Sequence, residues 1–226
     1  MLLSLKSLRG YSIQALDGDI GRLLDFYFDD TVWVVRYCAV DTGNWLPGRK
    51  VLLSPVSFGR PDWRTLLIPA SLTRDQILES PALDSDSPIS REHEDHLCRY
   101  YGWPAYWREG PAAPHLHSLR RVLRRHIQAT DGEIGHVDDF IVNVEDWRIR
   151  YLVANTRNWI PGRQILISAD WIMRISRTDR KVYLDLSRDA VRHSPDYDPT
   201  TPVNREYEIR LYDYYGRPAY WLEDSN

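Results

Sequence analysis

Apolar and polar residues alternate over several short runs of this chain, and this alternation predicts half-buried β-strands. The run from Trp33 to Val40 places four residues on one face and Arg36 on the other. The run from Trp147 to Ala154 repeats the arrangement, with Arg150 on the second face. The residues predicted to face the core are Trp33, Val35, Tyr37 and Ala39, and Trp147, Ile149, Tyr151 and Val153.

Turn signals separate the predicted strands. Asp-Gly pairs at Asp17 and Asp131 lie between apolar runs and predict tight hairpins. Pro-Gly pairs at Pro47 and Pro161 fit type II turns, in which proline fixes φ and glycine accepts a positive φ. The other expected strands are Ile20–Phe28, Lys50–Ser54, Gln164–Ser168, Thr65–Pro69 and Lys181–Asp185. Several short strands separated by turns indicate a small β-barrel.

Short helices are predicted after the strands. Thr73 and Ser187 are suitable N-caps for one pair of helices, which should end before prolines. Ser90 and Asn204 are suitable N-caps for a second pair, which should end at glycines in the left-handed conformation. The glycines at these ends are Gly102 and Gly216.

The chain contains the same pattern twice. A shift of 114 positions aligns Ser4–Trp107 with Ser118–Trp221 without a gap, and 41 of the 104 aligned residues are identical. We therefore predict two domains, residues 1–107 and 118–226, joined by a linker at 108–117 that is rich in proline and alanine. The fold class expected is mainly β, with two tandem barrels, each followed by short C-terminal helices.

Composition limits the environment and the class of partner. The hydrophobic content of 43% and the charged content of 27% are those of a folded protein. The net charge is −3, and neither repeat has the basic excess typical of a nucleic-acid-binding protein. No apolar run reaches the roughly 20 residues of a membrane-spanning helix, and Cys38 and Cys98 have no cysteine counterparts in the other repeat. We expect a cytoplasmic protein with reduced thiols and no membrane insertion.

The repeated pattern resembles a known family. Each repeat combines Asp-Gly-x-x-Gly-x-x-x-Asp with a later Trp-x-Pro-Gly-Arg turn, and the first repeat has Leu-x-Gly ahead of them at Leu8–Gly10. This combination is similar to the PRC-barrel domain. That family includes the cytoplasmic domain of the photosynthetic reaction centre H subunit and the C-terminal domain of a bacterial ribosome-maturation factor. Arg124 departs from the pattern, because it stands where the first repeat has Gly10. The resemblance implies a binding or assembly module without shared catalytic residues.

Each repeat ends in Tyr-Tyr-Gly-x-Pro-Ala-Tyr-Trp, at Tyr100–Trp107 and Tyr214–Trp221. One interpretation is that this aromatic segment closes one end of a barrel that is too small to bury enough surface alone. The alternative is that the aromatic side chains form a docking platform for a partner protein or for the other repeat. We favour the first interpretation, because both repeats need to fold.

Two histidines of the first repeat have a spacing that could place both on one metal ion. His93 and His96 lie one helical turn apart, with Glu92 and Asp95 beside them. Because the second repeat lacks these histidines and no third ligand is evident, a solvated polar face is the better explanation, and no metal or cofactor is expected. His115 and His117 belong to the predicted linker and give a weaker signal still.

Two acidic residues on predicted strands are candidates for general acid or base chemistry, Asp25 and Asp139. Arg36 and Arg150 lie on the adjacent strands in both repeats, and we predict structural ion pairs between Asp25 and Arg36 and between Asp139 and Arg150. No arrangement of catalytic Ser, Cys and His residues recurs, so no enzymatic activity is expected.

The function expected is therefore that of a protein-binding adaptor or assembly module, with another protein as partner and a homo-oligomer as a further possibility. The alternative is an RNA- or ribosome-associated factor, suggested by four arginines within Ser118–His126. Aromatic and basic residues near turns and chain ends are the candidate contact residues. They are Trp45, Arg49, Trp103, Trp107, Trp159 and Arg163.

Overall fold

The structure is a computed structural model of the chain, and it describes residues 1–226 except 44, 47, 84–88, 109–115, 157–162 and 224–226. The chain divides into two compact units. Unit 1 consists of Met1–Ser4, Val122–Asn143 and Ile149–Asn226, and unit 2 consists of Leu5–Arg121 and Val144–Arg148. Each unit is therefore built mainly from one sequence repeat and receives short segments of the other.

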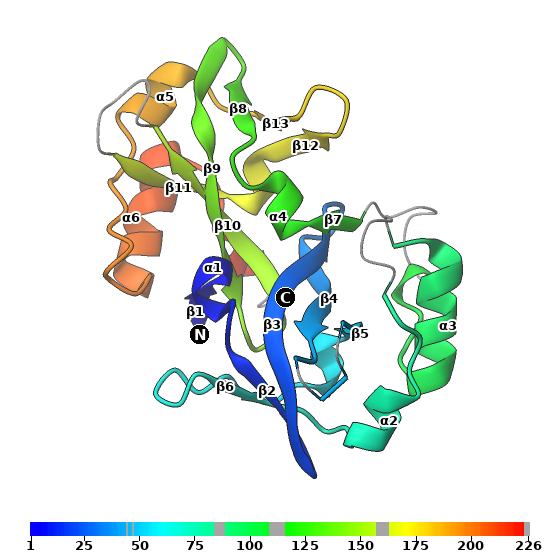
Figure 1. Cartoon of the computed structure of the whole chain (residues 1–226). Coiled ribbons are helices and arrows are strands. Elements are labelled where there is room, and N and C mark those ends of the chain that lie inside the picture. The colour runs from blue at the N-terminus through cyan, green and yellow to red at the C-terminus, as the bar shows by residue number, and fades with distance from the viewer. Residues whose placement is uncertain (44, 47, 84–88, 109–115, 157–162, 224–226) are drawn as a thin grey trace. The chain divides into compact units, whose positions relative to one another are not determined.

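Unit 1 is built around a β-sheet (Figure 1). The first residue of β10, Arg148, belongs to unit 2, and the rest of this strand belongs to unit 1. The strand order is β12-β13-β8-β9-β10, with β11 paired to β10 and β1 paired to β9. β13 and β8 are parallel, whereas the pairs β1–β9, β8–β9, β10–β11 and β12–β13 are antiparallel. The strands are β1 (Leu2–Ser4), β8 (His126–Ala129), β9 (Gly132–Asn143), β10 (Arg148–Asn155), β11 (Gln164–Ser168), β12 (Ile172–Ser176) and β13 (Lys181–Leu184).

Unit 2 repeats this topology with one difference. Its strand order is β4-β3-β2-β6, with β5 paired to β4 and β7 paired to β3. The segment equivalent to β12 makes only isolated bridges, from Phe58 to Ala70 and from Asp62 to Leu67. The strands are β2 (Ser12–Ala15), β3 (Gly18–Asp29), β4 (Val34–Asp41), β5 (Lys50–Leu53), β6 (Leu67–Pro69) and β7 (Leu116–Ser118).

The first strand of each repeat joins the sheet of the other repeat. β1 pairs with β9 in the register Leu2 to Asn143, and β7 pairs with β3 in the register Leu116 to Asp29. The tip of the β9–β10 hairpin, Val144–Arg148, also belongs to unit 2. The structure thus differs from a division into 1–107 and 118–226, because short segments of each repeat complete the unit built mainly from the other.

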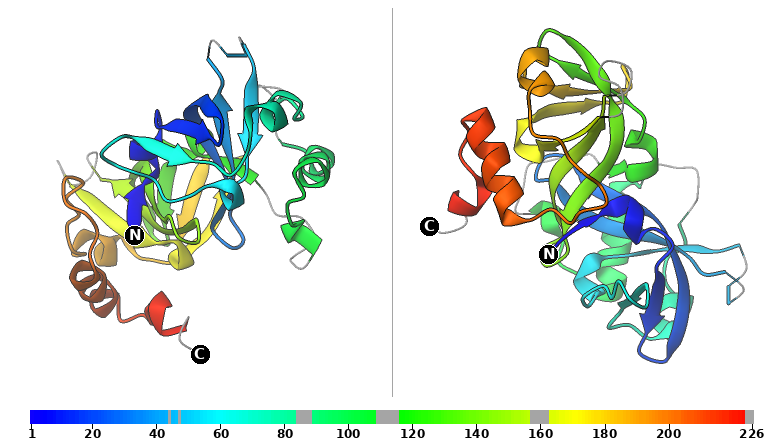
Figure 2. Two further views of the ribbon diagram at one scale, coloured as in Figure 1. Left: turned by 90° about the horizontal axis from the view of Figure 1, so that it is seen from below. Right: turned by 90° about the vertical axis from the view of Figure 1, so that its left-hand side faces the viewer.

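The helices begin and end where capping residues are found. Thr73, Ser90, Ser187 and Asn204 are N-caps, as predicted. The helices are α1 (Leu5–Leu8), α2 (Arg74–Leu78), α3 (Arg91–Tyr101), α4 (Leu119–Val122), α5 (Arg188–Arg192), α6 (Arg205–Tyr215) and α7 (Tyr220–Glu223), with 3-10 turns η1 (Pro55–Ser57), η2 (Tyr106–Arg108) and η3 (Ala169–Trp171). Gly102 and Gly216 end α3 and α6 with φ of 71° and 59°, which confirms the predicted left-handed caps. Figure 2 gives two further views of these elements.

The predicted hairpins and strands are largely confirmed. A two-residue turn joins β2 to β3 and another joins β8 to β9. Gly48 has the predicted positive φ, but Pro47, Pro161 and Gly162 lie outside the described residues. Among the predicted core residues, Trp33 has φ of 56° and precedes β4. All eight are buried, including Trp33 and Trp147.

Glycine is required where the early part of one strand lies close to the end of the next strand. A Cβ atom at Gly21 would lie 2.0 Å from the carbonyl oxygen of Asp41, and one at Gly135 would lie 2.1 Å from that of Asn155. This contact explains the second glycine of the repeated Asp-Gly-x-x-Gly motif. Arg124 stands where the first repeat has Gly10. The backbone keeps a positive φ at both positions, 65° at Arg124 and 88° at Gly10.

Within the parts of the chain that the structure describes, no helix is both long and apolar enough to cross a membrane.

Candidate functional site

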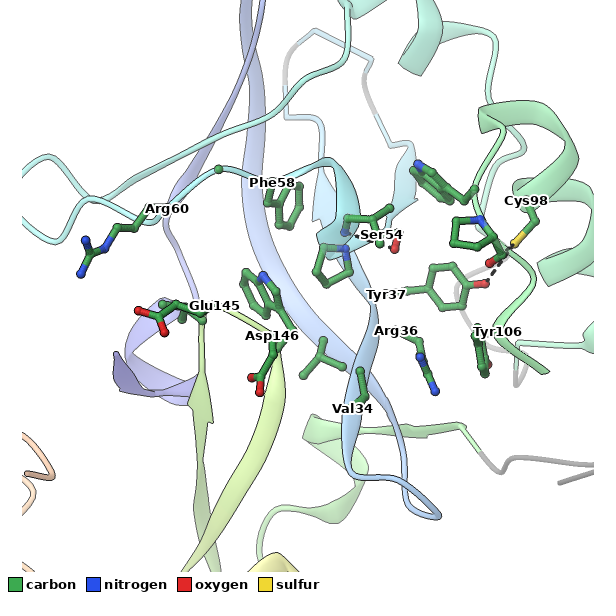
Figure 3. A pocket seen from close by; sticks show the side chains of 18 residues that line it. Val34, Arg36, Tyr37, Ser54, Phe58, Arg60, Cys98, Tyr106, Glu145 and Asp146 are labelled. Carbon is green, nitrogen blue, oxygen red and sulfur yellow. Dashed lines mark hydrogen bonds between the residues drawn. The ribbon is translucent and has the colours of Figure 1, made fainter. Parts of the chain in front are cut away.

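A cavity of about 630 Å³ lies within unit 2 (Figure 3). Its walls come from β4, from η1 and the residues after it, from the end of α3 with the aromatic segment that follows, and from the tip of the β9–β10 hairpin. The lining residues are Val34, Val35, Arg36, Tyr37, Ser54, Pro55, Val56, Phe58, Gly59, Arg60, Cys98, Trp103, Pro104, Tyr106, Val144, Glu145, Asp146 and Trp147. A cavity of this size and largely apolar lining is typical of a binding site.

One wall of the cavity is supplied by the second repeat. Trp147 is buried, and its ring lies 5.9 Å from the ring of Phe58 and 6.4 Å from that of Phe26, between centroids. Its carbonyl oxygen accepts a hydrogen bond of 2.9 Å from the amide of Val35. Its φ of 54° is unfavourable for a side chain of this size. These contacts hold the hairpin tip against β4 and explain why that backbone conformation is tolerated.

The opposite wall is formed by the repeated aromatic segment. Trp103 stacks on Tyr101 with 4.1 Å between ring centroids and an interplanar angle of 12°. The indole nitrogen of Trp103 donates a hydrogen bond of 3.0 Å to the hydroxyl of Ser57. Both aromatic residues pack against the core cluster that contains Tyr37 and Leu97. This segment therefore closes one side of the core, as the favoured interpretation predicts, and also lines the cavity.

A buried glutamate holds the end of the aromatic segment. The hydroxyl of Tyr106 donates a hydrogen bond of 2.5 Å to Glu94 on α3, and the guanidinium of Arg91 lies 2.9 Å from the other carboxylate oxygen. Arg36 lies over the Tyr106 ring at 3.8 Å from its centroid. Burial raises the pKa of Glu94, although the hydrogen bond from Tyr106 and the charge of Arg91 oppose the shift.

The second repeat keeps this arrangement around Glu208. The hydroxyls of Tyr151 and Tyr220 donate to its carboxylate at 2.7 and 2.8 Å, and Arg205 lies 3.2 Å from its second oxygen. Arg150 lies over the Tyr220 ring at 4.1 Å. The repeated final tyrosine is thus explained by a structural contact that both repeats make.

Charged residues of both signs lie at one end of the cavity. Figure 3 shows Arg60, Glu145 and Asp146 at this end, and Tyr37, Cys98 and Tyr106 at the other. Arg60 is exposed and forms no ion pair with the residues that the structure describes. An apolar interior with a charged rim of mixed sign is typical of protein-binding surfaces.

The loop that leads away from the cavity exposes large apolar side chains. Val56 is 63% exposed, Trp63 62% and Leu66 53%. The equivalent positions of the second repeat carry Asp170, Arg177 and Arg180, which are also exposed. The two loops share the same local backbone at their end, because Leu66 and Arg180 both have φ of 55°.

The cavity contains one thiol, that of Cys98, which is buried and 3.9 Å from the hydroxyl of Tyr37. Burial raises the pKa of the Cys98 thiol. It also raises the pKa of Tyr37 far above its ordinary value. Both groups are therefore protonated at neutral pH, which makes Cys98 a poor nucleophile.

The candidate contact residues lie in different places. Trp103 lines the cavity, whereas the half-buried Trp107 lies beneath the guanidinium of Arg91 at 4.3 Å. Arg74 lies over the Trp45 ring at 4.5 Å, away from the cavity lining. Trp159 lies outside the described residues. Of the predicted tryptophans, the structure thus places Trp103 at the cavity.

Arg49 and Arg163 have structural contacts. Arg49 donates to the carbonyl oxygen of Leu78 at 2.5 Å and to that of Ser80. Arg163 donates to the carbonyl oxygens of Arg192 and Ser194 and also binds Asp196. In each repeat this arginine satisfies carbonyl groups at the end of a short helix, where no intrahelical donor remains.

The predicted ion pair between Asp25 and Arg36 is not formed. Arg36 instead lies 3.3 Å from Asp29, while Asp25 accepts hydrogen bonds from the hydroxyl of Ser118 at 2.6 Å and the amide of Arg120 at 3.1 Å. The β3–β4 register shifts between Tyr27 and Phe28, which pair with Tyr37 and Val35, so Arg36 lies at a bulge rather than opposite a β3 residue. Sequence reasoning missed this exchange of partners, because the serine comes from the other repeat.

In the second repeat, Asp139 accepts hydrogen bonds from the hydroxyl of Ser4 and from the amide of Phe140 at 2.7 Å. Burial raises the pKa of the equivalent Asp25, and the hydrogen bonds from Ser118 and from the amides of Arg120 and Phe26 oppose this shift. Both aspartates therefore serve as acceptors for a strand supplied by the other repeat.

The histidine positions do not gather further ligands. Among the residues that the structure covers, no group of three or more His, Cys, Asp or Glu side chains is arranged to hold a metal ion. His93 has its pKa lowered by burial and by the nearby His96. His117, expected in the linker, lies in β7 and is 2.8 Å from Asp30.

Comparison with protein families gives one match. Residues 117–191, from β7 to α5, match the PRC-barrel domain. This segment therefore contains a PRC-barrel domain. No curated protein matches the chain.

Proposed function

We propose that this chain is a non-catalytic protein-binding adaptor made of two PRC-barrel domains, and that a partner protein docks at the cavity of unit 2. The identity of 41 of 104 aligned residues supports assigning the first repeat to the same family as residues 117–191. The observation that carries the proposal is the group of exposed apolar residues on the loop that borders the cavity. Val56 belongs to both the loop and the cavity lining.

The occupant that fits is a segment of a partner protein with a large apolar side chain. Such a side chain would enter between Phe58, Trp103 and Trp147, and Trp63 would extend the contact outside the cavity. Tryptophan and arginine are the residues that contribute most often to binding energy at protein interfaces. The concave shape favours a protruding side chain over a flat lipid surface.

The mixed charges at the rim disfavour a polyanion. Glu145 and Asp146 lie at the same end of the cavity as Arg60, and they would repel a phosphate backbone. This argument favours a protein over RNA as the occupant of this site.

The test is capture of partners from a lysate of the source organism, with and without nuclease, by the wild type and by Val56→Asp and Trp63→Arg. These variants introduce the residues that the second repeat carries at the same positions. The matched control is Met173→Asp, which removes an apolar side chain that is 67% exposed in unit 1.

We expect a protein that survives nuclease treatment, is retained by Met173→Asp and is lost with both loop variants. Loss with Met173→Asp as well would show that the interaction depends on general surface hydrophobicity. Recovery of RNA or ribosomal proteins that disappears after nuclease would favour the alternative function, and capture unaffected by the loop variants would exclude the cavity as the docking site.

A further inference from the structure

The donor strands of the two repeats have the same chemistry. Leu2-Leu3-Ser4 forms β1 and Leu116-His117-Ser118 forms β7, and both follow the pattern Leu-x-Ser. Each pairs antiparallel over three residues with the long third strand of the other repeat, β9 or β3. The same structural element is thus exchanged twice within one chain.

Each donor strand ends in a serine that binds a buried aspartate. Ser118 donates to Asp25 at 2.6 Å, and Ser4 donates to Asp139. Both aspartates are buried, 6% and 7% exposed, and a buried carboxylate that lost its donor would be strongly destabilised. The hydrogen bond from the serine therefore holds the donor strand in one register, and we call this serine the latch residue.

Additional contacts fix the two strands. The terminal amine of Met1 donates to the side-chain oxygen of Asn143 at 2.9 Å, next to β1. In the other exchange, His117 contacts Asp30 at 2.8 Å and lies 5.8 Å from the Phe28 ring. Each acceptor edge thus recognises both the backbone and the side chains of its donor.

We propose that the exchanged strand and the edge that accepts it form an assembly surface whose partner is another copy of the repeat. In this chain the partner repeat is covalently attached, which raises its effective concentration. When the connection between repeats is cut, the same edges accept the repeats of a second copy of this chain. The inference does not depend on the docking site proposed above.

The test is a full-length protein with a protease site inserted within residues 109–115, cleaved after purification. We expect the two halves to remain in one complex on size-exclusion chromatography. The double variant Ser4→Ala and Ser118→Ala should weaken their association by roughly 10- to 100-fold, because two buried carboxylates lose a donor. Ser12→Ala is the matched control, since the Ser12 side chain has no hydrogen bond to the described residues, and it should leave the affinity unchanged.

A second measurement tests assembly between copies. Isotopically light and heavy cleaved proteins are mixed, unfolded, refolded and analysed by native mass spectrometry. We expect complexes that combine one light and one heavy half. Two results would overturn the proposal: halves that separate and each keep their near-ultraviolet circular dichroism, or halves whose affinity is unchanged in the latch double variant. The first would mean that each repeat completes its own sheet, and the second that another surface joins them.

Discussion

The residues that follow β5 and those that follow β11 start from the same sequence pattern but form different surfaces. After β11 the chain makes β12 and a charged turn, whereas after β5 it makes isolated bridges and exposes Val56, Trp63 and Leu66. Both regions keep a residue with positive φ near their end, Leu66 in the first repeat and Arg180 in the second. Where the two repeats share a feature, it supports folding, and this region is where they differ most visibly in surface chemistry.

A second difference concerns the source of one indole ring. In the first repeat, Trp103 stacks on Tyr101 and contacts the small Ser57. In the second repeat, Trp171 occupies the position of Ser57 and lies 4.5 Å from Tyr215, while Arg217 takes the place of Trp103. Either arrangement covers the second tyrosine of the repeated motif. In the first repeat, the tryptophan that covers this tyrosine, Trp103, also lines the cavity.

The largest effect is expected where the repeats agree. Gly21→Ala and Gly135→Ala should each reduce the free energy of unfolding by about 3 kcal/mol or more, because the added Cβ would overlap a backbone carbonyl. Gly43→Ala is the control, since Gly43 has φ of 57° but open space around it, and it should cost about 1 kcal/mol. Urea unfolding measures all three. Equal costs at Gly21 and Gly43 would show that the strands can separate at this point.

An intermediate effect is expected from exchanging the indole arrangements. Trp103→Arg alone should destabilise the protein by roughly 2–3 kcal/mol through lost packing, and Ser57→Trp alone should also destabilise it by overpacking. The double variant reproduces the second repeat and should recover about 1 kcal/mol or more of the summed loss. A double-mutant cycle by urea unfolding measures the coupling. Additive costs would mean that the two arrangements are not equivalent solutions.

A smaller, pH-dependent effect is expected at Glu94. Because burial raises its folded-state pKa above the ordinary value of 4.5, its stabilising contribution is fully present below about pH 4.5 and is lost as pH rises through the folded-state pKa. Glu94→Gln should cost roughly 1–3 kcal/mol in acid and less at neutral pH. The charges facing this carboxyl are Arg91 and Arg36, and the hydroxyl of Tyr106 donates to it.

Urea unfolding of the wild type and of Glu94→Gln at a series of pH values measures this cost. Subtracting the two curves removes the contribution of Asp25, whose pKa is also raised. A cost that grows with pH would contradict the assigned direction of the shift.

Much of the local structure could be predicted from the sequence. The caps at Thr73 and Ser90, the hairpin at Asp17 and the glycine end of α3 depend on residues close together in the chain, and their side chains determine the outcome. The core face from Trp33 was found for the same reason, since alternation is a local signal.

The exchange of strands could not be predicted. A strand such as Leu116–Ser118 has the same hydrogen-bonding capacity toward β3 and toward β9, because both repeats present equivalent edges. The cavity was missed as well, because the hairpin tip at Trp147 reaches it from the other repeat. The substitution of Ser57 and Trp103 by Trp171 and Arg217 was visible in the aligned repeats and is the signal that could have located it.

The exchange of segments also imposes an order on synthesis. Unit 2 includes residues up to Arg148, so its folding cannot be completed until the ribosome has released the hairpin of the second repeat. Until β9 has been synthesised, β1 (Leu2–Ser4) lacks the strand with which it pairs in the structure. The nascent chain therefore carries an unpaired donor strand until β9 has been made, and the β1–β9 pairing joins residues that are synthesised at very different times.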